Sequence, residues 1–405
     1  MVMIKSVHFK NFFSFKDCKV DLNRLNVLVG INGVGKSNFI KALRVLKATV
    51  LEGALQDLIL NQWGGFDAMF FSGNKTVDDA MSNQVELEFE FEQDKLFKYG
   101  YHFQEPVYYQ ISFRKVASSQ NFSIFESFHT KHEDTGKRAY RYLQMANGKG
   151  YAREGLSADQ HTVRYQLDNV SESLLSQLVD KDRYFQIYTL REAIKDIAVY
   201  NYFDTTAHSA IRKPMLPTGS IRLSPDGSNL PQILNRIKIN SKLQDYPKII
   251  ASLHNINPHY VGIDFDFLGS NIELLLDEKG LDKAVHVTHI SDGTLRFLCL
   301  LSIIFNAQRG AVVCIDEPEV GLHPDMIMEV IGSIHQNNTD TQYVISTHSE
   351  HILNDVPVND LLVFEKADDN NTVVNVFRDK EFVEWASQYS TGKLWRNGDL
   401  GGNRY

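Results

Sequence analysis

The sequence predicts an α/β fold with mixed and parallel sheets, interrupted by an insertion that is first β-rich and then helical. Three observations lead to this fold class. Near the start of the chain a buried apolar strand runs into a glycine-rich loop and a helix, the middle is aromatic and strand-like, and strands alternate with helices from residue 214 onwards. Such alternation of strands and helices is typical of a largely parallel sheet.

Residues 1–95 are predicted to form the first part of the α/β unit. Strands are expected near residues 4–9 and at residues 25–30, followed by a helix over residues 36–48. Residues 85–92 alternate apolar side chains with four glutamates, which indicates a strand with one buried face and one acidic face. We expect the acidic face to be solvated, as charge runs usually are.

Residues 96–215 are predicted to be the insertion, and residues 216–405 to complete the α/β unit. In the insertion, Asn147-Gly148 predicts a hairpin turn, and the helical stretches lack the heptads of a long coiled coil. The insertion's strands are expected near residues 108–114, 121–128 and 139–145, and its helices near 171–179 and 184–199. Later strands and helices are expected at residues 232–240, 260–267, 272–276, 295–305, 311–315 and 343–346.

The glycine-rich loop is Gly30-Ile-Asn-Gly-Val-Gly-Lys-Ser37, which fits the Walker A pattern of a phosphate-binding loop. Its glycines permit the bend and the close approach of an anion, and the following helix points its N-terminus at the phosphates. Lys36 would supply a cation for the phosphates and Ser37 a hydroxyl ligand for Mg²⁺. The sequence therefore predicts an ATP and Mg²⁺ site. The predicted nucleotide contacts in this loop are Gly30, Asn32, Gly33, Gly35, Lys36, Ser37 and Asn38.

A second acidic motif lies far downstream, where the apolar residues 311–315 precede Asp316 and Glu317. A buried strand that delivers two carboxylates to its C-terminal end is the Walker B arrangement, because ligands of open α/β sheets bind at strand ends. Asp316 is predicted to help hold Mg²⁺, and Glu317 to polarise the attacking water. For Glu319, a role in a turn or dimer contact and a role in chemistry both stay open.

Three further segments fit the same chemistry. Ser291-Asp-Gly-Thr294 precedes a helix and is predicted to grip a second γ-phosphate through Ser291, Gly293 and Thr294. His348 follows a strand, and its likeness to the switch histidine of ABC ATPases implies a catalytic residue that senses the γ-phosphate. Gln62, before Trp63-Gly-Gly65, is the predicted glutamine of a Q-loop that contacts the metal.

With these motifs the chain resembles the RecF/SMC-like branch of ABC ATPases, most closely the stand-alone prokaryotic ATPases found in antiviral defence modules. The likeness extends to Asn11-Phe-Phe-Ser-Phe15, residues 223–230, Glu319-Val-Gly-Leu-His-Pro324 and Gly392-Lys-Leu-Trp395. Ser291-Asp-Gly-Thr294 looks like a degenerate form of the family's signature motif. The likeness implies a head-to-head homodimer or higher oligomer in which Ser291, Gly293 and Thr294 complete the partner's site. Phe13, where the family usually has an arginine, and Asp292, where a glycine is common, depart from the family pattern.

Several functions compete for this ATPase. The hypothesis we favour is a dimerisation switch that controls a separate effector, a nuclease or toxin, in antiviral defence; the alternative is a DNA repair or chromosome maintenance ATPase. The net charge of −8 does not favour bulk binding of nucleic acid, although a local basic groove would leave DNA binding open. A transporter subunit is disfavoured because the insertion separates the motifs widely.

A cytoplasmic location without membrane association is expected for the protein. The first residues lack a secretory signal, and the longest apolar run, residues 297–305, is too short to span a bilayer. The three cysteines, Cys18, Cys299 and Cys314, have no metal-like spacing and are expected to be reduced core residues.

Overall fold

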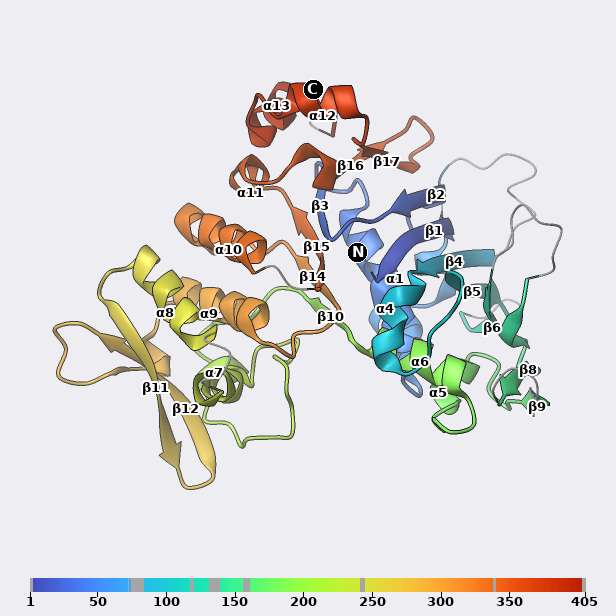
Figure 1. Cartoon of the computed structure of the whole chain (residues 1–405), viewed down its shortest axis with the longest axis horizontal. Coiled ribbons are helices and arrows are strands. Elements are labelled where there is room, and N and C mark those ends of the chain that lie inside the picture. The colour runs from blue at the N-terminus through green and yellow to red at the C-terminus, as the bar shows by residue number, and fades with distance from the viewer. Residues whose placement is uncertain are drawn as a thin grey trace.

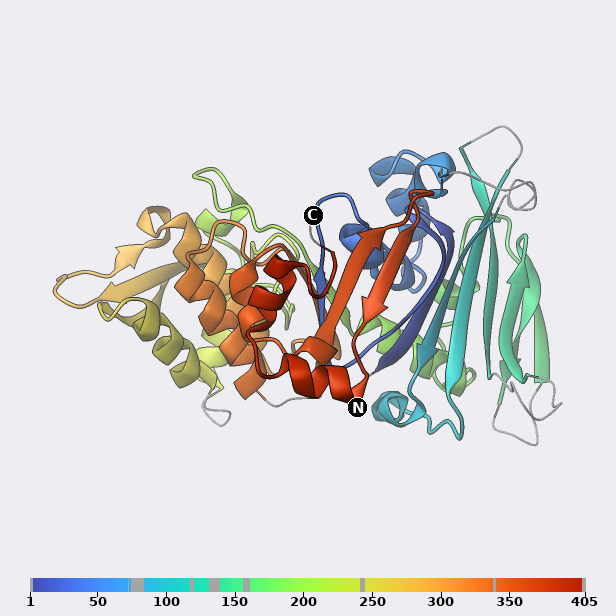
Figure 2. The same cartoon turned by 90° about the horizontal axis from the view of Figure 1, so that it is seen from above.

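The computed structural model describes residues 3–71, 73, 84–116, 120–130, 139–155, 161–240, 245–337 and 340–402. Within these residues, strands gather into three sheets (Figure 1). Seen from above, the central sheet lies between a group of helices on one side and a large antiparallel sheet on the other (Figure 2). Among the described residues, no helix is long and apolar enough to cross a membrane.

The central sheet has six strands in the order β10-β14-β15-β3-β16-β17. They are β10 (Ile197–Tyr200), β14 (Val312–Asp316), β15 (Gln342–Thr347), β3 (Leu25–Val29), β16 (Leu361–Lys366) and β17 (Thr372–Val376). Only the β16–β17 pair is antiparallel, which confirms the predicted parallel sheet. Thr347 pairs with Val29 and Asp316 with Ser346, so β3, β14 and β15 end side by side.

The second sheet has eight antiparallel strands in the order β2-β1-β4-β5-β6-β7-β8-β9. They are β1 (Ile4–Phe12), β2 (Phe15–Asp21), β4 (Gln84–Phe91), β5 (Val107–Lys115), β6 (Phe122–Thr130), β7 (Arg141–Ala146), β8 (Lys149–Glu154) and β9 (His161–Gln166). The expected insertion thus continues a sheet begun by the N-terminal strands, because β4 pairs with both β1 and β5. Asn147 and Gly148 both have positive φ at the β7–β8 turn, as the sequence predicts.

The third sheet corrects part of the predicted topology, since residues 260–278 do not join the parallel sheet. β11 (Tyr260–Leu268) and β12 (Asn271–Glu278) form an antiparallel hairpin, to which β13 (Val285–His286) is added. Only two residues separate Leu268 from Asn271, and a parallel crossover needs a dozen or more. The hairpin projects from the helical side of the molecule (Figure 1).

Helices cover both faces of the central sheet. The helices of the described residues are α1 (Lys36–Ala48), α2 (Ala54–Gln56), α3 (Phe66–Met69), α4 (Gln93–Leu96), α5 (Leu174–Gln177), α6 (Phe185–Lys195), α7 (Leu230–Ile239), α8 (Asp245–Ile256), α9 (Asp292–Phe305), α10 (Pro324–Gln336), α11 (Glu350–Asn354), α12 (Lys380–Ala386) and α13 (Thr391–Asn397). Leu28 and Cys314 face a core shared with α1, α6 and the antiparallel sheet, whereas Val27 and Ile315 face a core shared with α7–α10. A parallel sheet buried on both faces in this way requires continuously apolar strands, which explains residues 25–29 and 311–315.

The cysteines and the acidic strand show how far the local predictions held. Cys299 and Cys314 are free and buried as predicted, but Cys18 on β2 is only partly buried.

The acidic face of β4 is not simply solvated: Glu90 is 5% exposed and accepts a hydrogen bond from Ser6 Oγ at 2.9 Å. Lys5 on β1 pairs with Glu90 at 2.8 Å, so neighbouring strands supply the charges that this face needs.

Candidate functional site

The loop between β3 and α1 has the backbone shape that its glycines were predicted to permit. Gly30, Gly33 and Gly35 have φ values of 152°, 83° and 115°. A Cβ at Gly30 would lie 2.5 Å from the Phe364 carbonyl oxygen, and one at Gly35 would lie 2.6 Å from the hydroxyl oxygens of two neighbouring side chains. Any side chain at either position would therefore collide with its surroundings.

The first turn of α1 is suited to an anion. Gly35 caps the helix without a side-chain hydrogen bond, and no acidic residue lies in the first turn. The N–H groups at this end, together with the positive end of the helix dipole, are a favourable environment for phosphate oxygens. The flanking residues Asn32, Gly33 and Ser37 are exposed, so a ligand can reach them from solvent. The cradle and its charge fit a polyphosphate.

Lys36 lies at the base of this loop with its side chain folded back onto it. Its Nζ donates to the carbonyl oxygens of Gly30 at 2.8 Å and Ile31 at 3.2 Å, and lies 3.4 Å from His348 Nδ1. Burial lowers the pKa of Lys36 to about 8, although nearby carboxylates, Glu317 foremost, oppose the shift. The ammonium group is thus held at the site by carbonyl dipoles.

The carboxylates follow β14, as predicted. Ser346 on the neighbouring strand β15 donates its hydroxyl to Asp316 Oδ1, and its Oγ accepts from the Glu317 N–H at 3.0 Å. Burial raises the pKa of Asp316 above its usual value, an effect that a bound cation would reverse. Glu317 adopts a φ of 48°, which is uncommon for a residue with a side chain.

His348 joins these parts into one cluster. Its Nε2 lies 3.2 Å from Glu317 Oε1, and its Nδ1 faces Lys36 Nζ. Burial lowers the pKa of His348, and the positive charge of Lys36 lowers it further. A neutral imidazole that donates from Nε2 to Glu317 and accepts at Nδ1 from Lys36 satisfies both contacts. Residues from three sequence-distant segments therefore form one line of hydrogen-bonding groups.

Ser37 and Asp316 are the residues that could hold Mg²⁺. A hydroxyl oxygen and a carboxylate oxygen are ligands of the kind that Mg²⁺ takes at phosphate sites, where water and phosphate oxygens complete the shell. The donor set therefore fits the predicted cation.

The predicted signature segment lies at the start of α9. Ser291 caps this helix: its Oγ accepts from Thr294 N at 3.1 Å and lies 2.7 Å from Thr294 Oγ1. Ser291 is exposed whereas Thr294 is buried, so the serine can face a second molecule and the threonine supports it. A Cβ at Gly293 would lie 3.2 Å from the carbonyl oxygen of Gly321, in the turn that follows β14.

Asp292, which departs from the family pattern, is compensated by a cation. Arg212 Nη2 lies 2.5 Å from Asp292 Oδ1. The same guanidinium donates to the carbonyl oxygens of Val287 and Ile290, so it also closes the segment that precedes α9. The negative charge that would repel phosphate is thereby paired within the chain.

Two predicted residues are engaged elsewhere. Asn38 Nδ2 donates to Ser14 Oγ at 2.9 Å and so ties α1 to the turn between β1 and β2. Gln62 is exposed at the end of the π-helical segment Asp57–Gln62, where its amide donates to Asp57 Oδ2 at 2.9 Å. In the described part of the chain Gln62 has no hydrogen bond to Lys36, Glu317 or His348, and its amide is bonded within its own element.

Sequence reasoning gave no role to Ser346 or to Lys41. Ser346 lies at the same level of the sheet as Asp316, so the register of two parallel strands would have found it. Lys41 Nζ lies 3.9 Å from the centre of the Phe13 ring, next to Trp63. A cation thus lies against the aromatic ring at the position where the family's arginine is missing.

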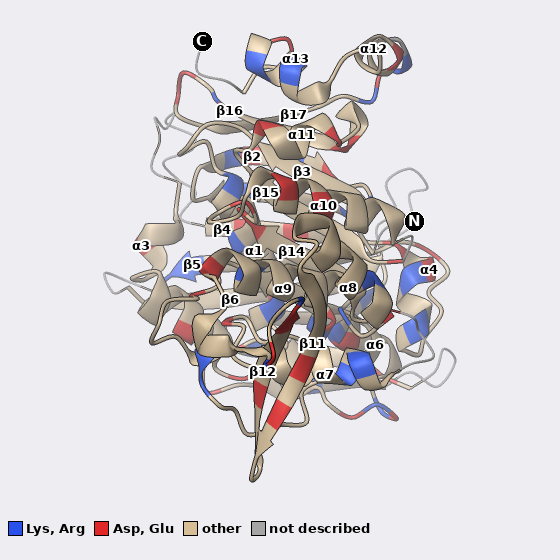
Figure 3. Ribbon diagram, turned by 90° about the vertical axis from the view of Figure 1, so that its left-hand side faces the viewer, with Lys and Arg blue, Asp and Glu red and all other residues tan. Residues whose placement is uncertain are grey.

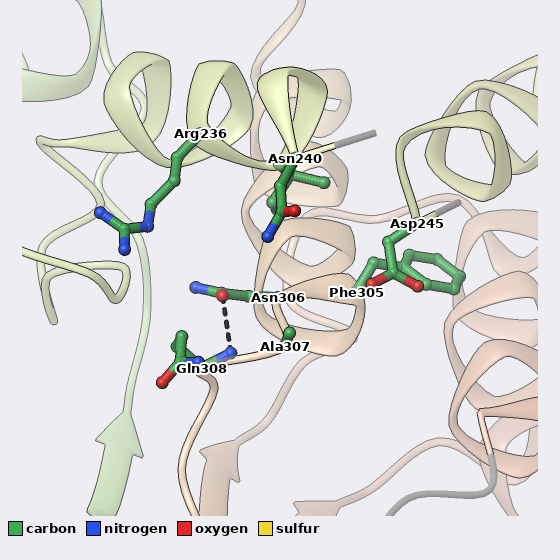
Figure 4. A pocket seen from close by; sticks show the side chains of 8 residues that line it. Arg236, Asn240, Asp245, Phe305, Asn306, Ala307 and Gln308 are labelled. Atoms are coloured by element: carbon green, nitrogen blue, oxygen red, sulfur yellow. Dashed lines mark hydrogen bonds between the residues drawn. The ribbon is translucent and has the colours of Figure 1, made fainter. Parts of the chain in front are cut away.

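A pocket away from this cluster contains none of the predicted residues. It lies between the end of α7, the start of α8 and the segment after α9 (Figure 4). Its lining includes Arg236, Asn240, Asp245, Asn306 and Gln308, and Gln308 N donates to Asn306 Oδ1 at 2.9 Å. This internal hydrogen bond shapes the end of α9, and the pocket is separate from the phosphate loop.

Comparisons with known proteins agree with the fold and with the loop. A model of the family described as "AAA domain, putative AbiEii toxin, Type IV TA system" matches residues 25–354. A Helicobacter pylori (strain ATCC 700392 / 26695) protein named ATP/GTP phosphatase is 22% identical over 379 residues, covering 87% of this chain and 86% of that protein.

Solved structures of SMC heads share the architecture. A head bound to the C-winged helix domain of ScpA has a TM-score of 0.57 at 12% identity, covering 94% of this chain and 99% of that one. A Pyrococcus furiosus-derived complex, a head with an extended coiled coil bound to the C-terminal domain of ScpA, has the same TM-score and identity, covering 96% and 99%. These likenesses show the P-loop ATPase-head fold predicted from the sequence.

Proposed function

The chain belongs to the family described as "AAA domain, putative AbiEii toxin, Type IV TA system", and we propose that it is an ABC-type dimerisation switch. It is an ATPase, and in our proposal hydrolysis controls a separate effector protein. The observation that carries the proposal is the cluster of Lys36, His348 and Glu317 at the ends of adjacent parallel strands. This cluster brings a phosphate-binding cation and a carboxylate base to the same loop.

Each residue has a proposed part in the reaction. The loop from Gly30 to Ser37 and Lys36 bind the phosphates of ATP, while Ser37 and Asp316 hold Mg²⁺, which neutralises phosphate charge when bound. Glu317 orients and polarises the attacking water, and His348 stabilises the carboxylate and senses the γ-phosphate. Because the pKa of His348 is lowered, its imidazole is neutral at physiological pH and acts as a hydrogen-bond donor.

The second half of the site is proposed to come from another copy of the chain. Ser291 is exposed at the N-terminus of a 14-residue helix, so its hydroxyl and the helix end can approach a γ-phosphate bound elsewhere. In the proposed homodimer Ser291, Gly293 and Thr294 complete the partner's site. Residues 1–95 and 216–405 form the ATPase head in this proposal, and residues 96–215 are its insertion.

The effector is proposed from the family and not from a residue of the site. The family description names a toxin of a Type IV TA system, which fits an ATPase that controls a nuclease or toxin in a cytoplasmic defence module. The alternative is an SMC-like ATPase that acts on DNA, a role with which the fold shared with SMC heads is compatible. Fold alone does not choose between these roles.

The test is ATP hydrolysis by the purified chain with three variants. Lys36→Ala should lose ATP affinity and hydrolysis about 100-fold or more, because it removes the cation of the phosphate loop. Glu317→Gln should keep ATP affinity, hydrolyse about 100-fold more slowly and accumulate as an ATP-bound dimer. Lys10→Ala, which removes a half-buried lysine paired with Glu86 on the antiparallel sheet, is the control and should behave as wild type.

Hydrolysis is measured by phosphate release and dimerisation by light scattering. Normal turnover by Lys36→Ala would overturn the assignment of the phosphate loop. An unchanged rate in Glu317→Gln would remove Glu317 from the role of base, and a Glu317→Gln chain that stays monomeric with saturating ATP would contradict the proposed switch.

A further inference from the structure

Glu319 lies three residues after Asp316 and has one carboxylate oxygen that is hydrogen-bonded and, in the part of the chain that the structure describes, one that is not. Its Oε1 accepts from two donors of the neighbouring loop, Thr347 Oγ1 at 2.8 Å and the backbone N–H of His348 at 2.7 Å. Its Oε2 is buried and has no hydrogen-bond partner among the described residues. One oxygen thus carries both contacts, while the other is enclosed without compensation.

The turn that contains Glu319 does not need this side chain for its closure. Val320 N donates to the Glu317 carbonyl oxygen at 3.2 Å, and Leu322 N donates to the Glu319 carbonyl oxygen at 3.1 Å. Gly321, with a φ of 76°, supplies the remaining change of direction. Backbone groups therefore close this turn without the Glu319 side chain.

An enclosed carboxylate oxygen without a donor is costly, on the order of 1–3 kcal/mol or more for a charged group. Buried polar groups of this kind are rare, and each one in a native structure calls for an explanation. Because the turn closes through its backbone, stability of the turn does not supply one. The contacts of Oε1 point to the loop after β15 as the reason for a carboxylate here.

That loop begins with His348, whose imidazole must lie between two groups at once. The hydrogen bond from His348 N to Glu319 fixes the backbone from which the ring extends, and the bond from Thr347 Oγ1 fixes the preceding residue. Thr347 Oγ1 in turn accepts from Ser349 N at 2.9 Å, so both sides of His348 are held. A displacement of this backbone would separate the ring from Glu317 or from Lys36.

We propose that Glu319 is a positioning residue that holds His348 in register with Glu317 and Lys36. This inference rests on the proposed function, because it gives His348 its place in that ATPase site. Glu319 acts on the reaction through His348 and does not touch the phosphates. Its contribution is geometric: the length of the side chain and its acceptor oxygen matter, and its negative charge does not.

Two substitutions separate geometry from charge. Glu319→Gln keeps the side-chain length and an oxygen that accepts from Thr347 and His348, but it removes the charge. Glu319→Asp keeps the charge but is one methylene shorter, so it cannot reach both donors. Positioning predicts that Glu319→Gln retains kcat within about 3-fold, whereas Glu319→Asp and Glu319→Ala lose about 10- to 100-fold with KM changed less than about 3-fold.

Hydrogen exchange of the nucleotide-free chain gives a readout that does not depend on hydrolysis. The peptide covering residues 344–350 should exchange faster in Glu319→Asp than in wild type and at the wild-type rate in Glu319→Gln, because the His348 N–H loses its acceptor only in the former. The control is Glu126→Gln. Glu126 is a buried glutamate on β6 of the antiparallel sheet, and it also accepts hydrogen bonds from backbone N–H groups, those of Leu174 and Leu175. This control should leave both kcat and this peptide unchanged.

Each outcome decides the inference. If Glu319→Asp hydrolyses ATP as wild type does, or if Glu319→Gln is the more damaged of the two, Glu319 does not position His348. Unchanged exchange of residues 344–350 in Glu319→Asp leads to the same conclusion. A wild-type chain that hydrolyses no ATP would instead reject the proposed function, while the exchange experiment would still report whether the contact holds the loop.

Discussion

In the absence of nucleotide, the Lys36 side chain already lies in the phosphate loop. Its ammonium group lies between loop carbonyls and the imidazole of His348, and burial lowers its pKa to about 8. A neighbouring phosphate favours the charged form and would raise that pKa again. Binding of nucleotide and binding of a proton are therefore coupled at this side chain.

The coupling predicts proton uptake on binding of a non-hydrolysable ATP analogue. The free chain has lost about a quarter of the Lys36 protons at pH 7.5 and about three-quarters at pH 8.5, as follows from a pKa near 8. Binding restores them, so calorimetric titrations in buffers of different ionisation enthalpy should show greater uptake at pH 8.5 than at pH 7.5. Lys36→Arg, which stays charged, should show none, and equal uptake at both pH values in wild type would contradict the shift.

The same residue affects stability in a defined direction. Between pH 8 and the unfolded pKa of 10.5, the unfolded chain binds more protons at Lys36 than the folded chain does. The contribution of Lys36 to the free energy of unfolding therefore rises with pH through that window and is unfavourable below it. At neutral pH the buried ammonium group of Lys36 therefore lowers the free energy of unfolding of the nucleotide-free protein.

At the scale of elements, α9 combines a structural and a functional end. Its first turn is capped by Ser291, its body is almost wholly buried against α7, α8 and α10, and its start contacts the turn after β14 at Gly321. The buried body fixes the helix direction. The exposed cap Ser291 is therefore presented at a defined place on the surface.

Substitutions at Ser291 should separate these two parts. Ser291→Ala removes the acceptor for Thr294 N and should lower the free energy of unfolding by about 1 kcal/mol, measured by urea denaturation. Ser291→Asp preserves a cap and should keep wild-type stability, but its charge would face the partner's phosphate. In both variants the part of the ATP hydrolysis rate that depends on protein concentration should fall about 10-fold or more. Full hydrolysis by Ser291→Asp would exclude Ser291 from the partner's site.

At the scale of the whole molecule, charge separates the two proposed roles. The net charge is −8, and the projecting hairpin of β11 and β12 carries acidic residues along both strands (Figure 3). Asp264 is paired with Lys238 from α7, and Asp266 is exposed on the same strand. A surface of this kind repels the phosphate backbone of nucleic acid.

We therefore expect weak DNA binding, with a dissociation constant above about 10 μM at 150 mM salt, in the range of non-specific affinity. Fluorescence anisotropy with a labelled duplex at several salt concentrations, with and without ATP and Mg²⁺, measures it. Binding that is tight at 150 mM salt and weakens steeply as salt rises would favour the DNA-acting alternative over the effector switch.

The sequence by itself determined the local features of the site. Gly30, Gly33 and Gly35 follow a buried strand, and Asp316 and Glu317 end another, because a phosphate loop and a carboxylate pair need particular residue types at short, fixed spacing. The parallel central sheet followed from continuously apolar strands between helices, and the Asn147-Gly148 turn from its backbone preference. Each of these depends on neighbours along the chain.

The tertiary structure alone decided the features that depend on partners far apart in sequence. The burial of Glu90 against Lys5 and the side-chain contact of Asn38 with Ser14 required knowledge of which surfaces meet. The same holds for Ser346 beside Asp316 and for Glu319 on the backbone of His348. Short motifs encode which groups can bind phosphate, but strand register and packing place those groups, because contacts such as that between Lys36 and His348 join residues that lie far apart along the chain.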